Sequence, residues 1–531
     1  MKRTLLSISL CVVLTVMMIA GCAPAPNAAG GPSAQAAQEN GSASSQGEGA
    51  AAVKDAVIFR IKAEPSSLDP HKTSGTGEAQ IIQYQFYESL FREEKDCTVV
   101  NALAESHSFN ADKTVLTCKL RQDVYFHNGG QMTADDVVFS LNRSMETGFN
   151  GVYVGAIDSV EKVDDFTVNI HLKYAYTPIV TCLSTLNTAI VPKSLVEADD
   201  DALMRSPVGT GAYRFVEWVA GDRIALDAFG DYWRGEAAIK HGQFKFIAEN
   251  STAMIALENG EIDVYANMSL SDIPLVDGNS NLKRSSSHSA ALLWFAFNNQ
   301  KGVFADVRMR KAVSMAVDRE AYLYGVDDGY GTVTTACMLE CLAEYPAGFE
   351  PDPYDIEAAK QLVIDAGYPN GVTVKVPTVD NQGYIKPTVM LQEELAKIGI
   401  NLEIELMERA AWNERVLSNS DYEVTSWAIV ITALDADFVA SMFHSANVNG
   451  NGNFSQCAIP ELDEVILKGR TLEPGEERNA VYREFCELIK EHCVGIPIDT
   501  NTREISSNAK LNGLQATPTQ HYYFYDWNWA A

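Results

Sequence analysis

A short apolar segment followed by an amphipathic helix, in residues 292–320, constrains the fold of this chain more than any other feature. Residues 292–297 (LLWFAF) form an apolar run of strand length that ends at two asparagines. Asp306 then signals the start of a helix. The apolar residues that follow at roughly helical spacing are Val307, Ala312, Val313, Ala316 and Val317. One face of this helix is therefore buried, and strand, loop and helix together predict an α/β fold.

The alternation of strands and helices continues along the chain, and it predicts a mostly parallel sheet covered by helices. The clearest unit is a strand at 372–376, a helix at 390–398 that ends at Gly399, and a strand at 402–406. Thr133 is the expected N-cap of a further helix. The other predicted strands are 56–61, 115–120, 163–172 and 495–498, and the other predicted helices are 81–90, 253–258, 354–366 and 481–489.

The first 22 residues have the pattern of a bacterial export signal. Two basic residues precede an apolar run at 5–19, and the string IAGC occupies residues 19–22. This string resembles a lipobox, which implies that Cys22 is diacylated and begins the mature protein; the alternative is an ordinary signal peptide with an incidental cysteine. Residues 23–52 are rich in Ala, Gly, Ser and Pro, so we expect a disordered tether with a span of roughly 30 Å.

Charge and length exclude some classes of protein. The chain has 531 residues, enough for two or more cores, and its formal charge of −29 argues against a nucleic-acid partner. No later apolar run is long enough to span a membrane. Eight cysteines follow Cys22 without a CxxC motif, and free thiols, a disulfide or a structural metal all stay open for them.

Several motifs in fixed order resemble those of the extracytoplasmic solute-binding proteins of family 5, the peptide and nickel receptors of ABC importers. They are KLRQDVYFHNGGQMTADDVVFSLNR at 119–143, PVGTGAY at 207–213, DYWRG at 231–235, NGEID at 259–263, and the block at 292–320. Ala212 replaces the usual proline of the second motif. The resemblance runs from about residue 57 to the C-terminus, essentially the whole mature body.

The resemblance implies an α/β, two-lobed fold of the class II periplasmic-binding-protein type, of the large peptide-receptor kind with an extra inserted subdomain. The first lobe would comprise residues 53–290 plus 500–531, with the inserted subdomain at about 86–204. The second lobe would comprise residues 291–499. The lobes would close over a ligand at their interface.

The family's ligand segment in the second lobe matches residues 426–438 (SWAIVITALDADF), where Trp427 and Asp435 stand in its pattern. In peptide receptors of the family, a further aspartate between such positions holds the α-ammonium of the peptide. Residues 428–434 contain no acid, and a buried ammonium without a counter-charge is costly. Either Asp435 takes that role, or the ligand is not a free-amino peptide bound in the usual way.

Further site residues follow from the same resemblance. Lys386, beside Tyr384, is the candidate cation for a peptide carboxylate, and a solvated loop lysine is the alternative. Trp412 and Trp427 are candidates for stacking on the ligand, although buried core tryptophans are as common. The loop at 65–76 would face the cleft with Ser74 and Thr76. His444 is a weak candidate for a nickel-chelate ligand.

We therefore expect a lipid-anchored, monomeric receptor on the extracytoplasmic side of the cell membrane. It would capture di- or oligopeptides and deliver them to ABC permease and ATPase subunits. We find no catalytic residue, cofactor site or metal site in the sequence. The alternatives are a receptor for another small polar solute, such as a metal chelate or sugar, and a sensor of the same fold. A secreted hydrolase is disfavoured because HExxH and GxSxG motifs are absent.

Overall fold

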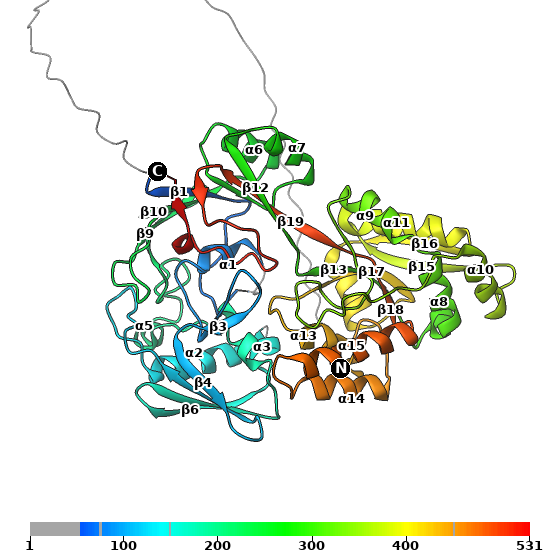
Figure 1. Ribbon diagram of the computed structural model, residues 1–531, viewed down its shortest axis with the longest axis horizontal. Coiled ribbons are helices and arrows are strands. Elements are labelled where there is room, and N and C mark those ends of the chain that lie inside the picture. The colour runs from blue at the N-terminus through cyan, green and yellow to red at the C-terminus, as the bar shows by residue number, and fades with distance from the viewer. Residues whose placement is uncertain (1–53, 74–76, 148–149, 450–451, 531) are drawn as a thin grey trace, which may run out of the picture. The chain divides into compact units, whose positions relative to one another are not determined.

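The computed structural model describes residues 54–73, 77–147, 150–449 and 452–530 (Figure 1). The predicted export signal, the lipid anchor Cys22 and the tether lie outside the described residues, as do Ser74 and Thr76. Residues 53–531 form one compact unit. In the described residues, no helix is both long and apolar enough to span a membrane.

The main sheet of the first lobe has eight strands in a mixed arrangement. Its order is β12-β19-β11-β1-β10-β9-β8, and β14 pairs with β19. The central strand β1 is parallel to β10 and β11, whereas the outer pairs are antiparallel. The strands are β1 (Ala56–Ile61), β8 (Tyr213–Val219), β9 (Arg223–Ala228), β10 (His241–Phe246), β11 (Val264–Ala266), β12 (Leu282–His288), β14 (Gly331–Val333) and β19 (Asp499–Asn508).

The aromatic C-terminal tail packs into the core of this lobe. Phe524 and Trp527 contact Phe59 of β1, and Phe524 stacks on Phe244 of β10. The helix predicted at 81–90 is shorter in the structure, where α1 spans Glu78–Gln83. Just after α1, the Gln85 side chain hydrogen-bonds to the backbone of residues 522 and 524 in the tail. Helices α6 (Asn250–Glu258) and α7 (Ile273–Asp277) complete this lobe.

A smaller four-stranded antiparallel sheet, in the order β4-β5-β7-β6, forms the inserted subdomain. Its strands are β4 (Ala104–Phe109), β5 (Val115–Leu120), β6 (Ile157–Asp164) and β7 (Thr167–Leu172). Thr133 and Asp136 form a capping box at the start of α2 (Ala134–Glu146), which confirms the predicted N-cap. The remaining elements nearby are β2 (Phe91–Glu93), β3 (Val99–Asn101), α3 (Gly151–Val154), α4 (Ile179–Cys182) and α5 (Lys193–Ala198).

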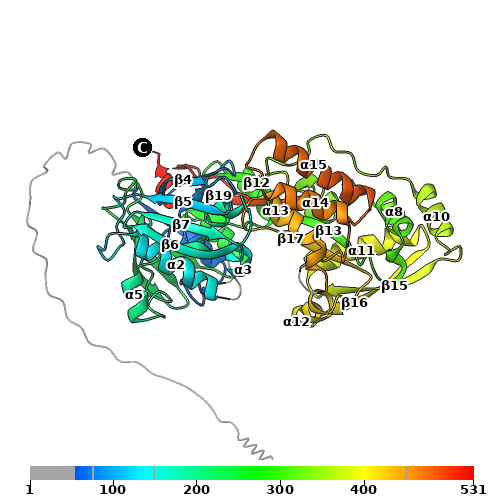
Figure 2. The same ribbon diagram turned by 90° about the horizontal axis from the view of Figure 1, so that it is seen from below.

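The second lobe contains the strand and the helix predicted for residues 292–320. β13 (Ala291–Phe297) is buried between β17 (Val424–Val430) and β18 (Gly495–Pro497), and Asp306 caps α8 (Val307–Ala316) by accepting from the Arg308 amide. Figure 2 shows α14 and α15 beside these strands. The other helices are α9 (Arg319–Asp327), α10 (Ile356–Asp365), α12 (Arg409–Trp412), α13 (Ala436–Ala440), α14 (Pro460–Gly469) and α15 (Glu476–Glu491).

Two predictions for this lobe are wrong in part. Among the described strands of this lobe, only β15 (Val372–Val379) and β16 (Ile400–Met407) pair in parallel, whereas β13 is antiparallel to both neighbours. Local alternation reveals a β-α-β unit but not the pairing of strands far apart in the chain. In addition, α11 (Gln382–Ala396) begins eight residues before the predicted start at residue 390. Asn381 caps its N-terminus, and the helix continues through Pro387. The predicted lobe and subdomain boundaries stay predictions.

Candidate ligand-binding site

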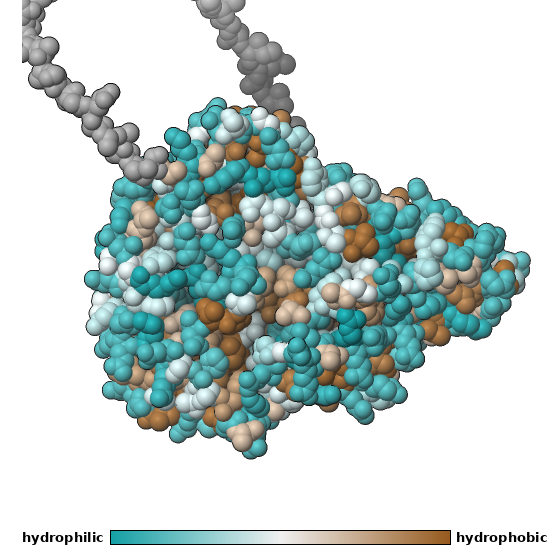
Figure 3. Space-filling view, viewed as in Figure 1, coloured by the Kyte–Doolittle hydropathy of each residue, from teal (hydrophilic) through white to brown (hydrophobic). Residues whose placement is uncertain are grey.

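A recess of about 420 Å³ lies where α3 of the inserted subdomain meets the end of β17. Its walls come from both lobes: the Tyr153 hydroxyl hydrogen-bonds to the Thr432 hydroxyl across it, and Val152 and Val430 expose apolar side chains. Figure 3 shows apolar residues gathered near the middle of the face, between the lobes. The lining residues are Val152, Tyr153, Val430, Ile431, Thr432, Phe438, Ser441, Met442, Asn447, Gly452 and Phe454.

No charged side chain of the described residues lines this recess. Its polar groups are the hydroxyls of Tyr153, Thr432 and Ser441 and the amide of Asn447. Such neutral donors and acceptors suit peptide bonds or sugar hydroxyls, and they offer no counter-charge for a buried ammonium. The acid-free interval at residues 428–434 supplies part of the recess wall.

An aromatic stack borders the recess through Phe454. The Trp427 ring lies 5.4 Å from the Phe454 ring and 4.9 Å from that of Trp412, to which it is nearly parallel at 9°. Tyr384 stacks on Trp427 at 6.3 Å. The structure thus brings together three of the residues predicted from sequence, Tyr384, Trp412 and Trp427.

The three stacked residues differ in exposure. Trp412 is 1% exposed, and its indole N–H donates to the Pro377 carbonyl at 3.1 Å, so it is a core residue that supports the stack. Trp427 and Tyr384 are half-buried. These two rings are therefore the ones that a ligand can reach.

A cation that sequence reasoning missed lies over the stack. The Arg409 guanidinium is 4.9 Å from the Tyr384 ring centre and 5.9 Å from that of Trp427. Arg409 lies three residues before Trp412 on α12, so both side chains share a helix face. This i, i+3 spacing is the sequence signal for Arg409, whereas the family resemblance points to a cation ahead of the helix predicted at 390–398.

Lys386 is not part of this cluster. It is exposed, and it lies inside α11 rather than in a loop ahead of it. Residues two apart on a helix point in different directions, so Lys386 does not share the Tyr384 face. Its charge instead opposes the rise in the pKa of Asp327, which burial and Asp328 raise to about 6.

Asp435 is also placed away from the recess. It is 6% exposed, caps α13 by accepting from the Asp437 amide at 2.8 Å, and pairs with Arg478, which also pairs with Glu344. Its carboxylate lines a second, larger cavity. Arg478 therefore balances the charge of Asp435, and a ligand role for Asp435 stays a prediction.

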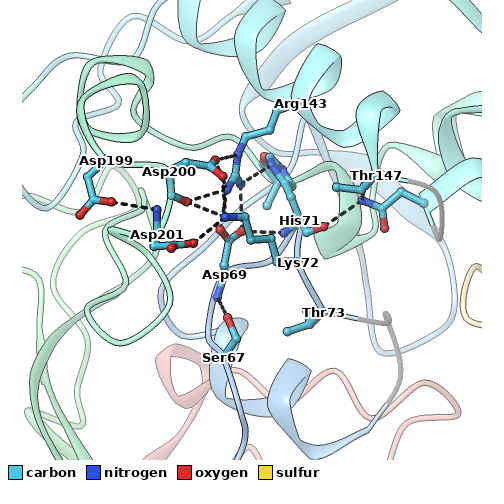
Figure 4. Close-up of polar contacts among 12 residues, drawn as sticks. Ser67, Asp69, His71, Lys72, Thr73, Arg143, Thr147, Asp199, Asp200 and Asp201 are labelled. Atoms are coloured by element: carbon cyan, nitrogen blue, oxygen red, sulfur yellow. Dashed lines mark hydrogen bonds and ion pairs between the residues drawn. The ribbon is translucent and has the colours of Figure 1, made fainter. Parts of the chain in front are cut away.

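The loop that carries the predicted residues Ser74 and Thr76 is anchored at its base (Figure 4). Arg143 of α2 donates to both oxygens of the buried Asp69 carboxylate, at 2.9 and 2.6 Å, and to the His71 Nδ1. The His71 Nε2 bonds to the Ala189 carbonyl. Burial lowers the pKa of His71 to about 4, so the ring is neutral near pH 7.

Comparison with known proteins relates this geometry to a family. The model for "bacterial extracellular solute-binding proteins, family 5 Middle" matches residues 98–451. The glutathione-binding protein GsiB of Pectobacterium atrosepticum is 25% identical over 490 residues, which cover 90% of this chain and 94% of that protein. The GsiB protein of Escherichia coli K12 is 25% identical over 489 residues, with the same coverage.

Solved structures match over the same span. HbpA2 from Haemophilus parasuis has a TM-score of 0.82 at 24% identity, and the match covers 90% of this chain and 100% of that one. DppA from Helicobacter pylori, in complex with the peptide STSA, has a TM-score of 0.75 at 24% identity, with 90% and 99% covered. These matches confirm the predicted two-lobed α/β fold.

Proposed function

We propose, because the chain belongs to the bacterial extracellular solute-binding proteins of family 5, that it captures small peptides between its lobes. It would deliver them to the permease and ATPase subunits of an ABC importer. In this proposal the receptor has no catalytic step, is monomeric and is held at the membrane by a lipid on Cys22. The observation that carries the proposal is the uncharged recess beside the Trp427 stack.

The site favours a peptide bound by its backbone and one carboxylate. Hydroxyl and amide groups in the recess can bond to peptide N–H and C=O groups, and the Trp427 and Tyr384 rings can cover apolar side chains. The Arg409 guanidinium, beside these rings, suits a carboxylate because its planar fork can donate two parallel hydrogen bonds. A ligand ammonium would then lie toward solvent.

Glutathione is the first ligand to test, since GsiB relatives are named for binding it. It is a small peptide with two carboxylates, so it can pair with Arg409 at one end. An uncharged sugar is the second candidate, because neutral walls and aromatic faces suit hydroxyl-rich rings. A metal chelate fits less well, because His444 does not line the recess and lies 3.7 Å from the Asp463 carboxylate.

Isothermal titration of the purified protein tests these candidates. We expect glutathione or a short-peptide pool to bind with a Kd in the micromolar range or below, while neutral disaccharides do not bind. Saturable sugar binding without any peptide binding would overturn the peptide proposal. A protein that binds none of them would contradict both candidates.

Two variants localise the site. Trp427 contacts Phe454 of the recess wall, and Arg409 lies over the Trp427 stack. Trp427→Ala and Arg409→Ala are therefore each expected to weaken binding about tenfold or more, a loss of about 1.4 kcal/mol. The matched controls are Trp218→Ala and Arg205→Ala, an arginine–tryptophan pair that stacks at 3.9 Å on the first lobe away from the recess. Equal effects in the controls would remove the Trp427 stack from the site.

A further inference from the structure

The larger cavity holds two cysteines in its wall. It measures about 780 Å³, and both the inserted subdomain and the second lobe line it. Cys97 lies in the turn between β2 and β3, and Cys341 lies in the segment between β14 and α10. Two thiols from distant parts of the chain therefore meet at this cavity.

These two cysteines differ from the other six that the structure describes. Cys97 and Cys341 are half-buried, whereas the others are buried. A reagent in the cavity can thus reach the pair, while the buried thiols are shielded by the cores around them. The buried cysteines are Cys118, Cys182, Cys337, Cys457, Cys486 and Cys493.

The two thiols interact directly. A hydrogen bond from Cys341 lowers the pKa of Cys97, although burial and the Asp96 charge oppose this shift. The same contact, together with burial and the charge of Glu93, raises the pKa of Cys341. Of the two thiols, Cys97 is therefore the one that forms a thiolate more readily.

The backbone of Cys97 is held in an unusual conformation. Its φ of 67° is in the left-handed region, which is unusual for a residue other than glycine. A tight turn fixes this conformation: the Cys97 amide donates to the Glu94 carbonyl at 3.0 Å, and the Asp96 carboxylate accepts from the Thr98 amide at 3.1 Å. The position of the thiol is thus set by the turn.

We propose that Cys97 and Cys341 form a reversible disulfide that ties the inserted subdomain to the second lobe. The Cys97 thiolate attacks one sulfur of an external disulfide and releases one thiol. The Cys341 thiol then loses its proton and attacks the Cys97 sulfur of the mixed disulfide, which releases the second thiol. The two protein thiols are oxidised, and one external disulfide is reduced to two thiols.

The bond would add a covalent link to a boundary at which apolar side chains of both parts already pack together. The ion pair between Lys113 and Glu473 at this cavity is partly exposed and contributes little to stability. Thr177 adds hydrogen bonds to the Arg470 and Leu472 carbonyls. A covalent link between the same parts would restrict their relative movement and stabilise the closed arrangement. Extracytoplasmic proteins commonly carry such disulfides.

A peptide map tests the disulfide without any knowledge of the ligand. The purified full-length protein is reduced, freed of reductant, treated with cystamine under native conditions, and digested without reduction. We expect a linked peptide pair containing Cys97 and Cys341, lighter by two hydrogens than the two peptides apart. The Cys97→Ser variant should give no linked peptide that contains Cys341. Cystamine adducts on both cysteines of the wild type, without a link, would overturn the proposal.

A melting experiment tests whether the bond constrains the two parts. The oxidised wild type should melt several degrees above the reduced form, whereas Cys97→Ser should melt at the same temperature after either treatment. Cys118→Ser, which removes a buried thiol, controls for general effects of cysteine replacement and should keep the difference. Equal melting temperatures for linked and reduced wild type would overturn the claim that the bond holds the parts together.

Discussion

Asp499 places an unpaired carboxylate inside the protein at the start of β19. Its Oδ2 has no hydrogen-bond partner among the described residues, and burial together with the charge of Asp327 raises its pKa to about 7. An unfolded aspartate has a pKa of about 3.9. Because the pKa of Asp499 is higher in the folded state, its protonation stabilises the fold. This contribution to the unfolding free energy is complete below about pH 4 and is lost as the pH rises through about 7.

Replacing this acid should flatten the pH dependence of stability. Between pH 5 and pH 8 we expect the wild type to lose about 1–3 kcal/mol more unfolding free energy than Asp499→Asn, because only the wild type must ionise a buried carboxyl. Urea unfolding followed by tryptophan fluorescence measures the difference. Asp380→Asn, at an exposed position, is the control and should keep the wild-type slope. A variant with the wild-type slope would show that Asp499 does not carry the effect.

At the scale of elements, the segment at 65–73 depends on a single arginine of α2. Arg143→Met removes the bidentate ion pair of the fully buried Asp69 carboxylate, and it also removes the hydrogen-bond donor to His71. We expect a loss of about 3–5 kcal/mol in unfolding free energy, because a buried charge is left unpaired. Arg223→Met also removes an arginine with two acidic partners, but on a partly exposed hairpin, and should cost at most about 1 kcal/mol. Equal losses, measured by urea unfolding, would contradict the anchoring role.

Individual elements were largely predictable, but their partners were not. The strand β13, the cap of α8 and the unit of β15, α11 and β16 follow from local patterns of apolar and capping residues. The antiparallel pairing of β13 with β17 joins residues far apart in the chain, which local periodicity does not encode. The cysteine pair was missed for the same reason, since tertiary packing brings its two members to one cavity.

At the scale of the whole molecule, the site depends on contacts between lobes. Tyr153 of the inserted subdomain bonds to Thr432 of the second lobe across the recess, and the same lobe carries the Trp427 stack. Family motifs located the aromatic residues because they lie in a recognisable segment. They did not reveal Tyr153, because it becomes part of the recess wall only where the inserted subdomain contacts the second lobe. The recess is thus a property of the assembled body, and a ligand that bridges both walls would favour the closed state.

The attachment of this body to the membrane is the last prediction, and it concerns residues that lie outside the described structure. If Cys22 is lipidated, the protein from the membrane fraction should begin at Cys22, and its intact mass should include a diacylglycerol group. Cys22→Ser should instead move the protein to the soluble fraction, because a peripheral chain without acyl groups has no strong membrane affinity. Cys11→Ser is the matched control, since it changes another cysteine of the same leader and should leave the lipid in place. An unmodified mature protein that begins elsewhere would contradict the anchor, while the proposed ligand site would be unaffected.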